Sequence, residues 1–245
     1  MAAKLGLQLF TLREECAEDF VGTLEKVAAL GYEGVEFAGY YGMSAADLKH
    51  ELDRLNLTAI SAHVPIPQLR DNLADTIAYQ KAIGAKYIVC PYLSEEDRQK
   101  YKELVPLFKE VAAACQKEGM TFGYHHHDFE LEPYEGTDGL SYLLTHLSAE
   151  ELIAEFDVYW LRKAGKSPVE WLRAHKGRTP LVHLKDMTQD GSFAALGEGD
   201  TDIQAILAEE KSSEVEWWIV EQDVTPGPAL ESVAKSREYL KTIYR

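Results

Sequence analysis

Residues 153–185 read IAEFDVYWLRKAGKSPVEWLRAHKGRTPLVHLK, and this stretch contains one complete unit of the pattern that decides the fold. It begins with a short apolar run at Ile153–Val158, continues through a helical stretch near residues 168–176, and returns to a short apolar run at Leu181–Lys185. Pro168 follows Ser167 at a first helical position, which marks the start of the helix. A short run, a helix and a second short run are typical of a parallel βαβ unit.

The same alternation extends over the whole chain. The short apolar runs number eight and lie at Lys4–Thr11, Gly34–Ala38, Thr58–Val64, Tyr87–Pro91, Thr121–His127, Ile153–Val158, Leu181–Lys185 and Trp217–Gln222. Helical stretches are expected near residues 19–30, 44–55, 69–83, 97–118, 138–147, 168–176, 202–210 and 229–243. Eight such units predict an α/β fold, a closed (β/α)8 TIM barrel, in one domain spanning residues 1–245. The competing architecture is an open doubly wound sheet, but no G-x-G-x-x-G follows the first run.

Local signals also mark the ends of several helices. Ser44 followed by Asp47 resembles a capping box at a helix start, and Gly31 and Gly119 stand where helices are expected to stop. No linker, long repeat or low-complexity tract divides the sequence.

Composition restricts the classes of partner. The 245 residues include 25 Lys and Arg against 41 Asp and Glu, a formal net charge of −16, which disfavours nucleic acid and membrane surfaces as partners. The start of the chain, MAAKLGLQLFTLREE, does not have the pattern of a signal peptide, so we expect a cytoplasmic protein. Cys16, Cys90 and Cys115 are widely spaced and are expected to be buried, reduced thiols. The oligomeric state stays open, a homo-oligomer included.

Polar residues end most of the predicted strands, and in a barrel the C-terminal strand ends carry the active site. These residues are Glu36, His63, His125, His126, His127, Asp157, His183, Lys185 and Glu221. Because side chains alternate along a strand, His125 should share a face with His127, and His183 with Lys185, while His126 points away. Carboxylates and imidazoles from the last four strands would then converge, and this mixed donor set suits one divalent metal, Mn²⁺, Co²⁺, Fe²⁺, Zn²⁺ or Mg²⁺.

Each of these residues also has a simpler interpretation. A lone Glu36 at a strand end is more often a solvated loop residue, and His63 alone is evenly balanced between a core and a functional histidine. Trp160 lies just beyond Asp157 and is the tryptophan expected to line a pocket. We assign Glu36, His63 and Trp160 to substrate binding, and expect the heads of Lys185 and His63 to be hydrated at the barrel mouth.

The chain resembles the sugar phosphate isomerase/epimerase family, the xylose isomerase-like barrels that include ketose 3-epimerases, inosose isomerases and dehydratases, and a DNA-repair endonuclease. The segments that carry the resemblance are LQLFTLR at 7–13, GYEGVEFAG at 31–39, SAHVP at 61–65, GYHHHDFEL at 123–131, EFDVYWLRKAG at 155–165, VHLKDM at 182–187 and GEGDTDI at 197–203. They are specific for the superfamily and weakly specific for a substrate.

The resemblance implies a metal held by a Glu, an Asp, a His and a Glu from strands five to eight. Asp157, His183 and Glu221 match the last three positions, whereas His125 stands where the epimerases carry the first Glu. The His usually found three residues after the strand-six Asp is replaced by Trp160, which argues against a multinuclear phosphodiesterase centre.

The resemblance also implies the chemistry. We predict a metal-dependent isomerase or epimerase of a keto sugar, keto-cyclitol or sugar phosphate, working through a metal-held enediolate, with Glu221, Lys185 and His127 as catalytic residues. A lyase acting on an inosose or a 3-keto-glycoside is the alternative. A catalytically silent binding barrel and a repair phosphodiesterase are the other classes, and the net charge disfavours the latter. No nucleotide cofactor is expected.

Overall fold

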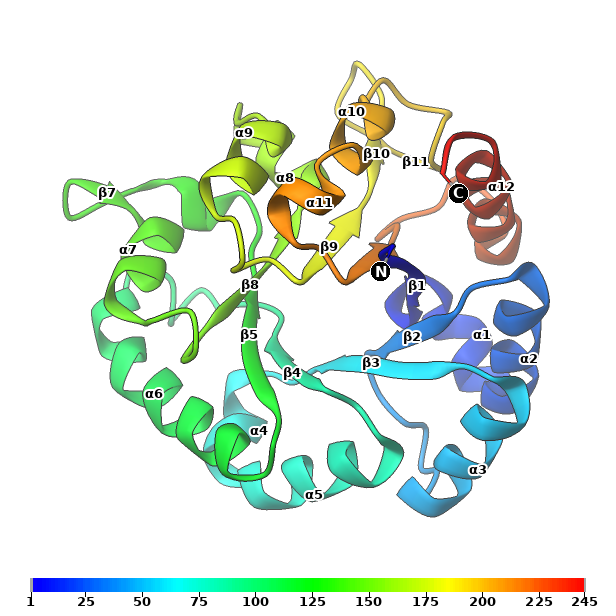
Figure 1. The fold of residues 1–245 in the computed structure, drawn as a ribbon, viewed down its shortest axis with the longest axis horizontal. Coiled ribbons are helices and arrows are strands. Elements are labelled where there is room, and N and C mark those ends of the chain that lie inside the picture. The colour runs from blue at the N-terminus through cyan, green and yellow to red at the C-terminus, as the bar shows by residue number, and fades with distance from the viewer. Residues whose placement is uncertain (1, 245) are drawn as a thin grey trace.

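The computed structural model describes residues 2–244 and shows a closed barrel of parallel strands (Figure 1). The barrel strands are β1 (Lys4–Gln8), β2 (Gly34–Phe37), β3 (Thr58–His63), β4 (Tyr87–Cys90), β5 (Thr121–His125), β8 (Ile153–Asp157), β9 (Leu181–Leu184) and β12 (Trp217–Val220). They close in the order β1-β12-β9-β8-β5-β4-β3-β2. Each predicted apolar run therefore forms a barrel strand, and the predicted TIM barrel is confirmed.

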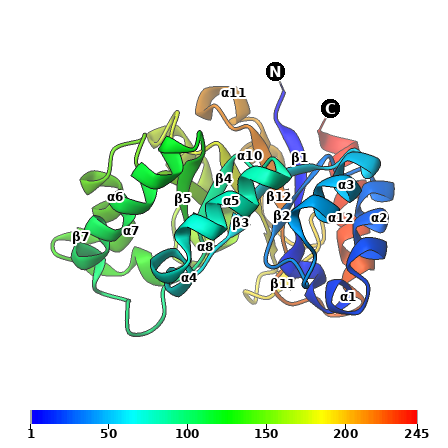
Figure 2. The same ribbon diagram turned by 90° about the horizontal axis from the view of Figure 1, so that it is seen from below.

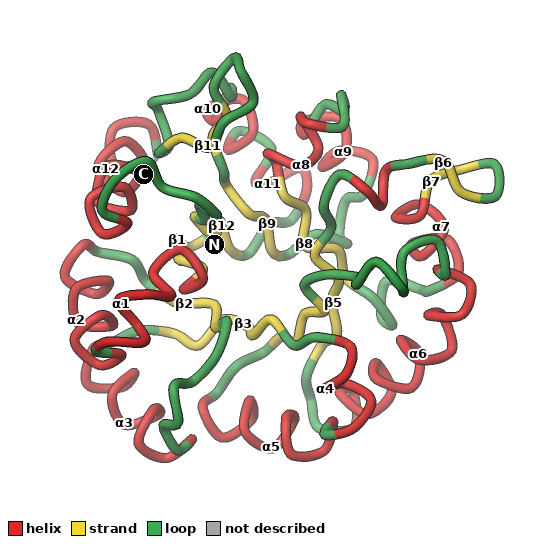
Figure 3. The backbone as a smooth tube through the Cα atoms, turned by 180° about the vertical axis from the view of Figure 1, so that it is seen from behind, coloured by secondary structure: helices red, strands yellow, loops and turns green. Residues whose placement is uncertain are grey.

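Helices surround the strands on the outside, so that in Figure 3 a ring of strands lies within a ring of helices. The helices are α1 (Arg13–Glu18), α2 (Phe20–Leu30), α3 (Ala45–Leu55), α4 (Ile66–Asp71), α5 (Leu73–Ile83), α6 (Tyr101–Lys117), α7 (Gly139–His146), α8 (Val158–Lys163), α9 (Pro168–Ala174), α10 (Ile203–Leu207), α11 (Glu210–Ser213) and α12 (Ala229–Ile243). Among the described residues, no helix is both long enough and apolar enough to cross a bilayer.

Three of the predicted helix boundaries agree with the caps in the structure. The Ser44 side chain accepts a hydrogen bond from the backbone N–H of Asp47 at the start of α3, and Ser167 caps α9 in the same way through Glu170. Gly31 ends α2 with φ of 90°, a left-handed conformation in which a side chain would be strained.

The structure differs from the sequence-based expectation after the first strand. The apolar run continues to Thr11, but β1 ends at Gln8 because the Gln8 side chain accepts the N–H of Phe10 and starts a short 3-10 helix, η1 (Leu9–Leu12). Helices α1 and α8 were not predicted. The stretch expected near residues 69–83 is divided into α4 and α5 at Asn72, and α6 begins at Tyr101 rather than near residue 97. A second 3-10 helix, η2 (Phe129–Leu131), and the two-stranded sheets β6–β7 (Pro133–Tyr134, Thr137–Asp138) and β10–β11 (Asp186–Met187, Phe193–Ala194) decorate the loops.

The barrel interior has an apolar half and a polar half. Its apolar cluster consists of Ile60, Tyr87, Val89, Ile153, Leu181, Trp217 and Ile219. These residues come from the middle or beginning of their strands, so the polar residues that follow them point into the other end of the barrel. The two chain ends lie close together on one side, where Tyr244 donates to the carbonyl of Ala3 (Figure 2).

Candidate active site

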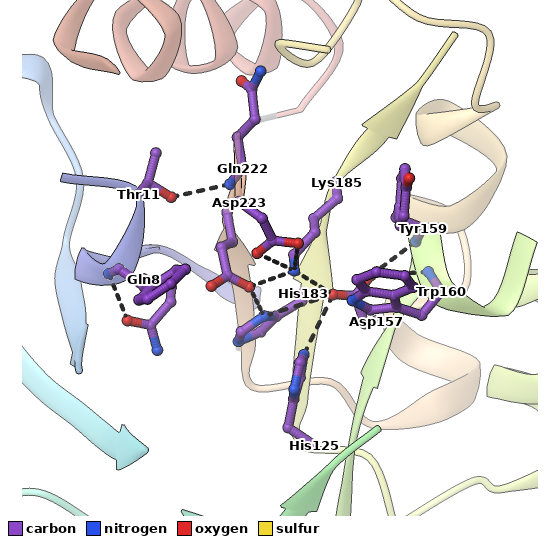
Figure 4. A network of polar contacts seen from close by, with 12 residues as sticks. Gln8, Thr11, His125, Asp157, Tyr159, Trp160, His183, Lys185, Gln222 and Asp223 are labelled. Atoms are coloured by element: carbon purple, nitrogen blue, oxygen red, sulfur yellow. Dashed lines mark hydrogen bonds and ion pairs between the residues drawn. The ribbon is translucent and has the colours of Figure 1, made fainter. Parts of the chain in front are cut away.

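The strand register brings the predicted residues to one place. In the parallel pair of β8 and β9, Asp157 lies beside His183, and Ile219 of β12 lies beside His183 on the other side. Glu221 therefore stands one layer higher, next to Lys185. Figure 4 shows His125, Asp157, His183 and Lys185 pointing toward one another from neighbouring strands.

Four of these side chains form a cluster that could hold a metal ion. His125, Asp157, His183 and Glu221 each offer one donor atom, and these atoms lie within 4.8 Å of one another. The Nδ1 atom of His183 is 2.8 Å from Oε2 of Glu221, and Nε2 of His125 is 3.3 Å from Oδ2 of Asp157. All four residues are buried. Two imidazoles and two carboxylates fit a divalent first-row metal.

Lys185 shows that this cluster stabilises a positive charge. Its ammonium lies 2.7 Å from Oε2 of Glu221, 2.9 Å from Oδ2 of Asp157 and 2.9 Å from Oδ1 of Asp223. The expectation that the head of Lys185 is hydrated is wrong, since the residue is 1% exposed and three carboxylates replace the water. Asp223 was missed by the sequence analysis, although its spacing of two residues from Glu221 was a usable signal.

The same contacts hold the cluster in its charged form. Burial alone raises the pKa of Glu221 and of Asp157, but the Lys185 ammonium and the neighbouring histidines outweigh burial, so both pKa values lie well below their ordinary range. Burial lowers the pKa of Lys185, and the carboxylates of Asp157 and Glu221 then raise it well above its usual value. An ionised carboxylate therefore faces a protonated amine in the site.

A second polar layer lies beneath the cluster. Nε2 of His183 is 2.7 Å from Oε1 of Glu36, and Nε2 of His63 is 2.9 Å from Oε2 of Glu155 and 3.1 Å from Glu36. Since a carboxylate only accepts, His183 donates from Nε2 to Glu36 and from Nδ1 to Glu221. Burial lowers the pKa of His183, but the carboxylates of Glu155, Glu36 and Glu221 raise it well above its usual value, so Nδ1 would have to lose its proton to bind a metal. Burial lowers the pKa of His63, but Glu36 and Glu155 raise it to about 10.

Two residues that were predicted to bind substrate, Glu36 and His63, belong to this second layer. Glu36 is fully buried and also accepts a hydrogen bond from the Gln8 side chain at 2.7 Å, so it supports His183 from below. Its contact with a substrate stays a prediction. His63 keeps 10% of its side chain exposed and lines the cavity above. Gln8 and Glu155 were missed, although Glu155 precedes Asp157 by two residues on the same strand face.

The three consecutive histidines divide as the alternation predicts. His125 donates from Nδ1 to the carbonyl of Pro91 at 3.2 Å, which leaves Nε2 for the cluster. His126 points away and is a core residue, where burial lowers its pKa to about 4 and its Nε2 accepts the N–H of Asp157. His127 lines the same cavity as His125, and its ring lies 4.9 Å from that of Trp160.

A cavity of about 320 Å³ opens onto this cluster. It is lined by Phe10, Ala38, His63, Pro65, Pro91, Tyr92, His125, His127, Lys185, Glu221 and Asp223. Trp160 packs behind His127 and is not part of this lining, so its predicted contact with a substrate stays a prediction. The size suits one monosaccharide-sized ligand.

The comparisons with known proteins agree with this architecture. The sequence model of one family, described as xylose isomerase-like TIM barrel, matches residues 24–243. The chain is similar to an inosose dehydratase of Clostridium beijerinckii (strain ATCC 51743 / NCIMB 8052), with 24% identity over 269 residues that cover 91% of this chain and 89% of the relative.

Two solved structures are similar to it as well. One is a sugar phosphate isomerase/epimerase from Parabacteroides distasonis ATCC 8503, with a TM-score of 0.87, 23% identity and coverage of 100% of this chain and 96% of the other. The second is a D-allulose 3-epimerase from Methylomonas sp. in complex with D-allulose, with a TM-score of 0.74, 14% identity and coverage of 99% and 98%. At these identities the likeness establishes the fold.

Proposed function

The chain belongs to the xylose isomerase-like TIM barrel family, and we propose that it is a metal-dependent enzyme that removes the proton beside the carbonyl of a keto sugar or keto-cyclitol and then eliminates water. One observation carries the proposal, the ion pair at 2.7 Å between the Glu221 carboxylate and the Lys185 ammonium inside a four-ligand cluster. It supplies a base and an acid at one place. The inosose dehydratase that the chain resembles supports a lyase.

The four residues of the cluster would hold the metal. His125, Asp157, His183 and Glu221 would be its ligands, and a divalent metal bound there would act as a Lewis acid toward a substrate oxygen. The second layer would orient these ligands, because Glu36 accepts the Nε2 proton of His183 and so leaves Nδ1 as the nitrogen that would face the metal.

The chain's own residues divide the proton transfers. The ionised Glu221 takes the proton from the carbon beside the carbonyl, which leaves an enediolate. Lys185 donates a proton to the hydroxyl on the next carbon, the C–O bond breaks, and water leaves. Glu221 can then return its proton to Lys185 across the 2.7 Å contact, which restores both groups.

The isomerase or epimerase predicted from the sequence is the second candidate. Epimerisation needs a proton carrier on each face of the reacting carbon, and both nitrogens of His125 are already engaged, by Pro91 and by Asp157. His127 is the residue that favours this candidate, since it lines the cavity and its buried Nδ1 has no partner among the described residues.

A panel of inososes and ketoses in deuterated water separates the candidates. A lyase consumes the substrate and produces the absorbance of an enone. An isomerase or epimerase gives a product of the same composition as the substrate, except that one carbon-bound hydrogen is replaced by deuterium. Glu221→Gln should lower turnover by about 10²–10⁴-fold. Neither signal from any member of the panel would overturn the enzymatic proposal and leave a binding protein.

A further inference from the structure

A groove of about 720 Å³ lies on the outside of the barrel between α5 and α6. The two helices follow the neighbouring strands β3 and β4 and lie next to each other in the outer ring (Figure 3). The groove is more than twice as large as the cavity of about 320 Å³ at the catalytic cluster, and the two share no residue. It is therefore a surface that the proposed reaction does not use.

Most of the groove lining is apolar. Ile77 is 5% exposed, whereas Ala74, Ala78 and Ala82 are exposed to solvent and follow one another at intervals of one helical turn. A helix face that is turned to water usually carries polar and charged residues. Short side chains on both helices also allow another pair of helices to approach closely. The apolar residues of the lining, which resemble those of a helix-packing surface, are Leu73, Ala74, Ile77, Ala78, Ala82 and Ala114.

Charged side chains stand at the two ends of the groove. Lys81 of α5 and Glu118, which follows α6, form an ion pair at 2.9 Å, so the ends of the two helices lie side by side. Lys117 lies at this end of the groove, whereas Asp75 lies near the start of α5. Both residues are exposed, and neither has an ion-pair partner among the described residues 2–244. The groove thus leaves one unpaired charge of each sign at opposite ends.

This face is complementary to itself. A two-fold axis through the groove would set α5 and α6 against the same two helices of a second copy, which then run antiparallel as in a four-helix bundle. Because the direction is reversed, Asp75 of each copy comes level with Lys117 of the partner subunit. Two equivalent ion pairs would then flank the apolar contact.

The charge of the whole chain also favours this face. With a formal net charge of −16, two copies repel each other over most of their surfaces. The charged residues of the groove lining are Lys81, Lys117 and Glu118, so this face is not acidic. Two copies can therefore approach each other here with little repulsion.

From the apolar groove and the unpaired charges at its ends, we infer that α5 and α6 form the interface of a symmetric dimer of this chain. The inference does not rest on the proposed function, because the groove and the catalytic cavity share no residue. The mouth of the barrel stays open in such a dimer, since the two helices lie on the side of the barrel (Figure 3).

Sedimentation velocity over about 1–100 µM protein measures the association directly. The wild type should shift from the chain mass of 27.5 kDa toward twice that mass as the concentration rises. Ala78→Glu places an unpaired charge in the middle of the interface, and should raise the dissociation constant of the dimer by about 30-fold or more. At the lowest concentration, where both proteins are monomers, their circular dichroism and Tm should be nearly equal because Ala78 is exposed.

Further variants locate the interface. Ala174→Glu is the matched control, because Ala174 is an exposed alanine at the end of α9, outside the groove, and its replacement should leave the dissociation constant unchanged. Lys117→Asp sets like charges against each other and should weaken the dimer by about tenfold. Adding Asp75→Lys to this variant exchanges the two charges and should restore the dimer.

A wild type that stays monomeric over the whole range would overturn the inference and leave the groove to a different protein. A dimer that Ala78→Glu leaves intact would also overturn it, because the interface would then lie elsewhere. If the exchange of charges did not restore a dimer that Lys117→Asp had weakened, the antiparallel arrangement would be wrong.

Discussion

Replacing Lys185 by Met tests whether the ammonium holds the cluster together when no metal is bound. The substitution keeps the length of the buried stem and removes the charge that lies within 2.9 Å of Glu221, Asp157 and Asp223. Three carboxylates would then face one another without a lysine between them. Breaking a buried ion pair by removing one partner costs about 3–5 kcal/mol.

This loss of stability predicts a lower melting temperature. For a chain of this size, 1 kcal/mol shifts Tm by about 2–4 °C. The metal-free Lys185→Met protein should therefore melt roughly 6–20 °C below the wild type. A divalent metal neutralises two of the same carboxylates, so added Mn²⁺ should raise the Tm of the variant by more than it raises that of the wild type.

Scanning calorimetry after chelation, with and without Mn²⁺, measures both effects. Lys81→Met is the matched control, since Lys81 and Glu118 form an exposed ion pair with side-chain exposures of 58% and 40%, and such pairs contribute about 0–1 kcal/mol. If metal-free Lys185→Met loses no more stability than Lys81→Met, the ammonium does not hold the cluster and the charge argument fails.

Three further predictions concern the cluster and its surroundings. The purified protein should carry about one divalent metal per chain by elemental analysis, and no metal after reconstitution would contradict the four-ligand site. Glu36→Gln should weaken metal binding by about 10–100-fold in a chelator competition while the fold is kept, because the substitution loosens the orientation of His183; unchanged affinity would remove Glu36 from the support of the site. Burial raises the pKa of Glu130 from 4.5 to about 7, so the folded protein holds this proton more tightly than the unfolded chain does. The stability that the proton provides is therefore complete below pH 4.5 and is lost as the pH rises through about 7. Urea unfolding should show the wild type losing about 3 kcal/mol relative to Glu130→Gln across this window, and parallel pH profiles would refute the shift.

The barrel was predictable because its strands are fully buried and read as apolar runs with helical stretches between them. The cluster was predictable in part because parallel strands deliver their last residues to one opening, as Asp157 and His183 do. Glu155 and Gln8 escaped because they lie inside their runs, where a polar residue reads as an interruption. Their role depends on which strands are neighbours, and this is a property of the closed barrel.

Helix α8 shows a different reason for a missed element. Asp157 is its N-cap and accepts the backbone N–H groups of Tyr159 and Trp160 through Oδ1, while Oδ2 faces Lys185. The sequence pattern indicates a metal ligand at Asp157 and gives no sign that the same carboxylate also caps a helix. One carboxylate thus serves both a helix and the cluster, and a single sequence position does not reveal such double use.

The lining of the cavity follows the order of the chain. Its apolar residues come from segments that end by Tyr92, and its polar and charged residues other than His63 begin at His125. Recombination at a point between them, in the loop or helix α6, would exchange one half-barrel and keep the other. Relatives that share the second half of the barrel could then bind new ligands without a change in the reaction. For a protein engineer, a library of chimaeras joined within residues 93–120 would be an economical route to new specificities.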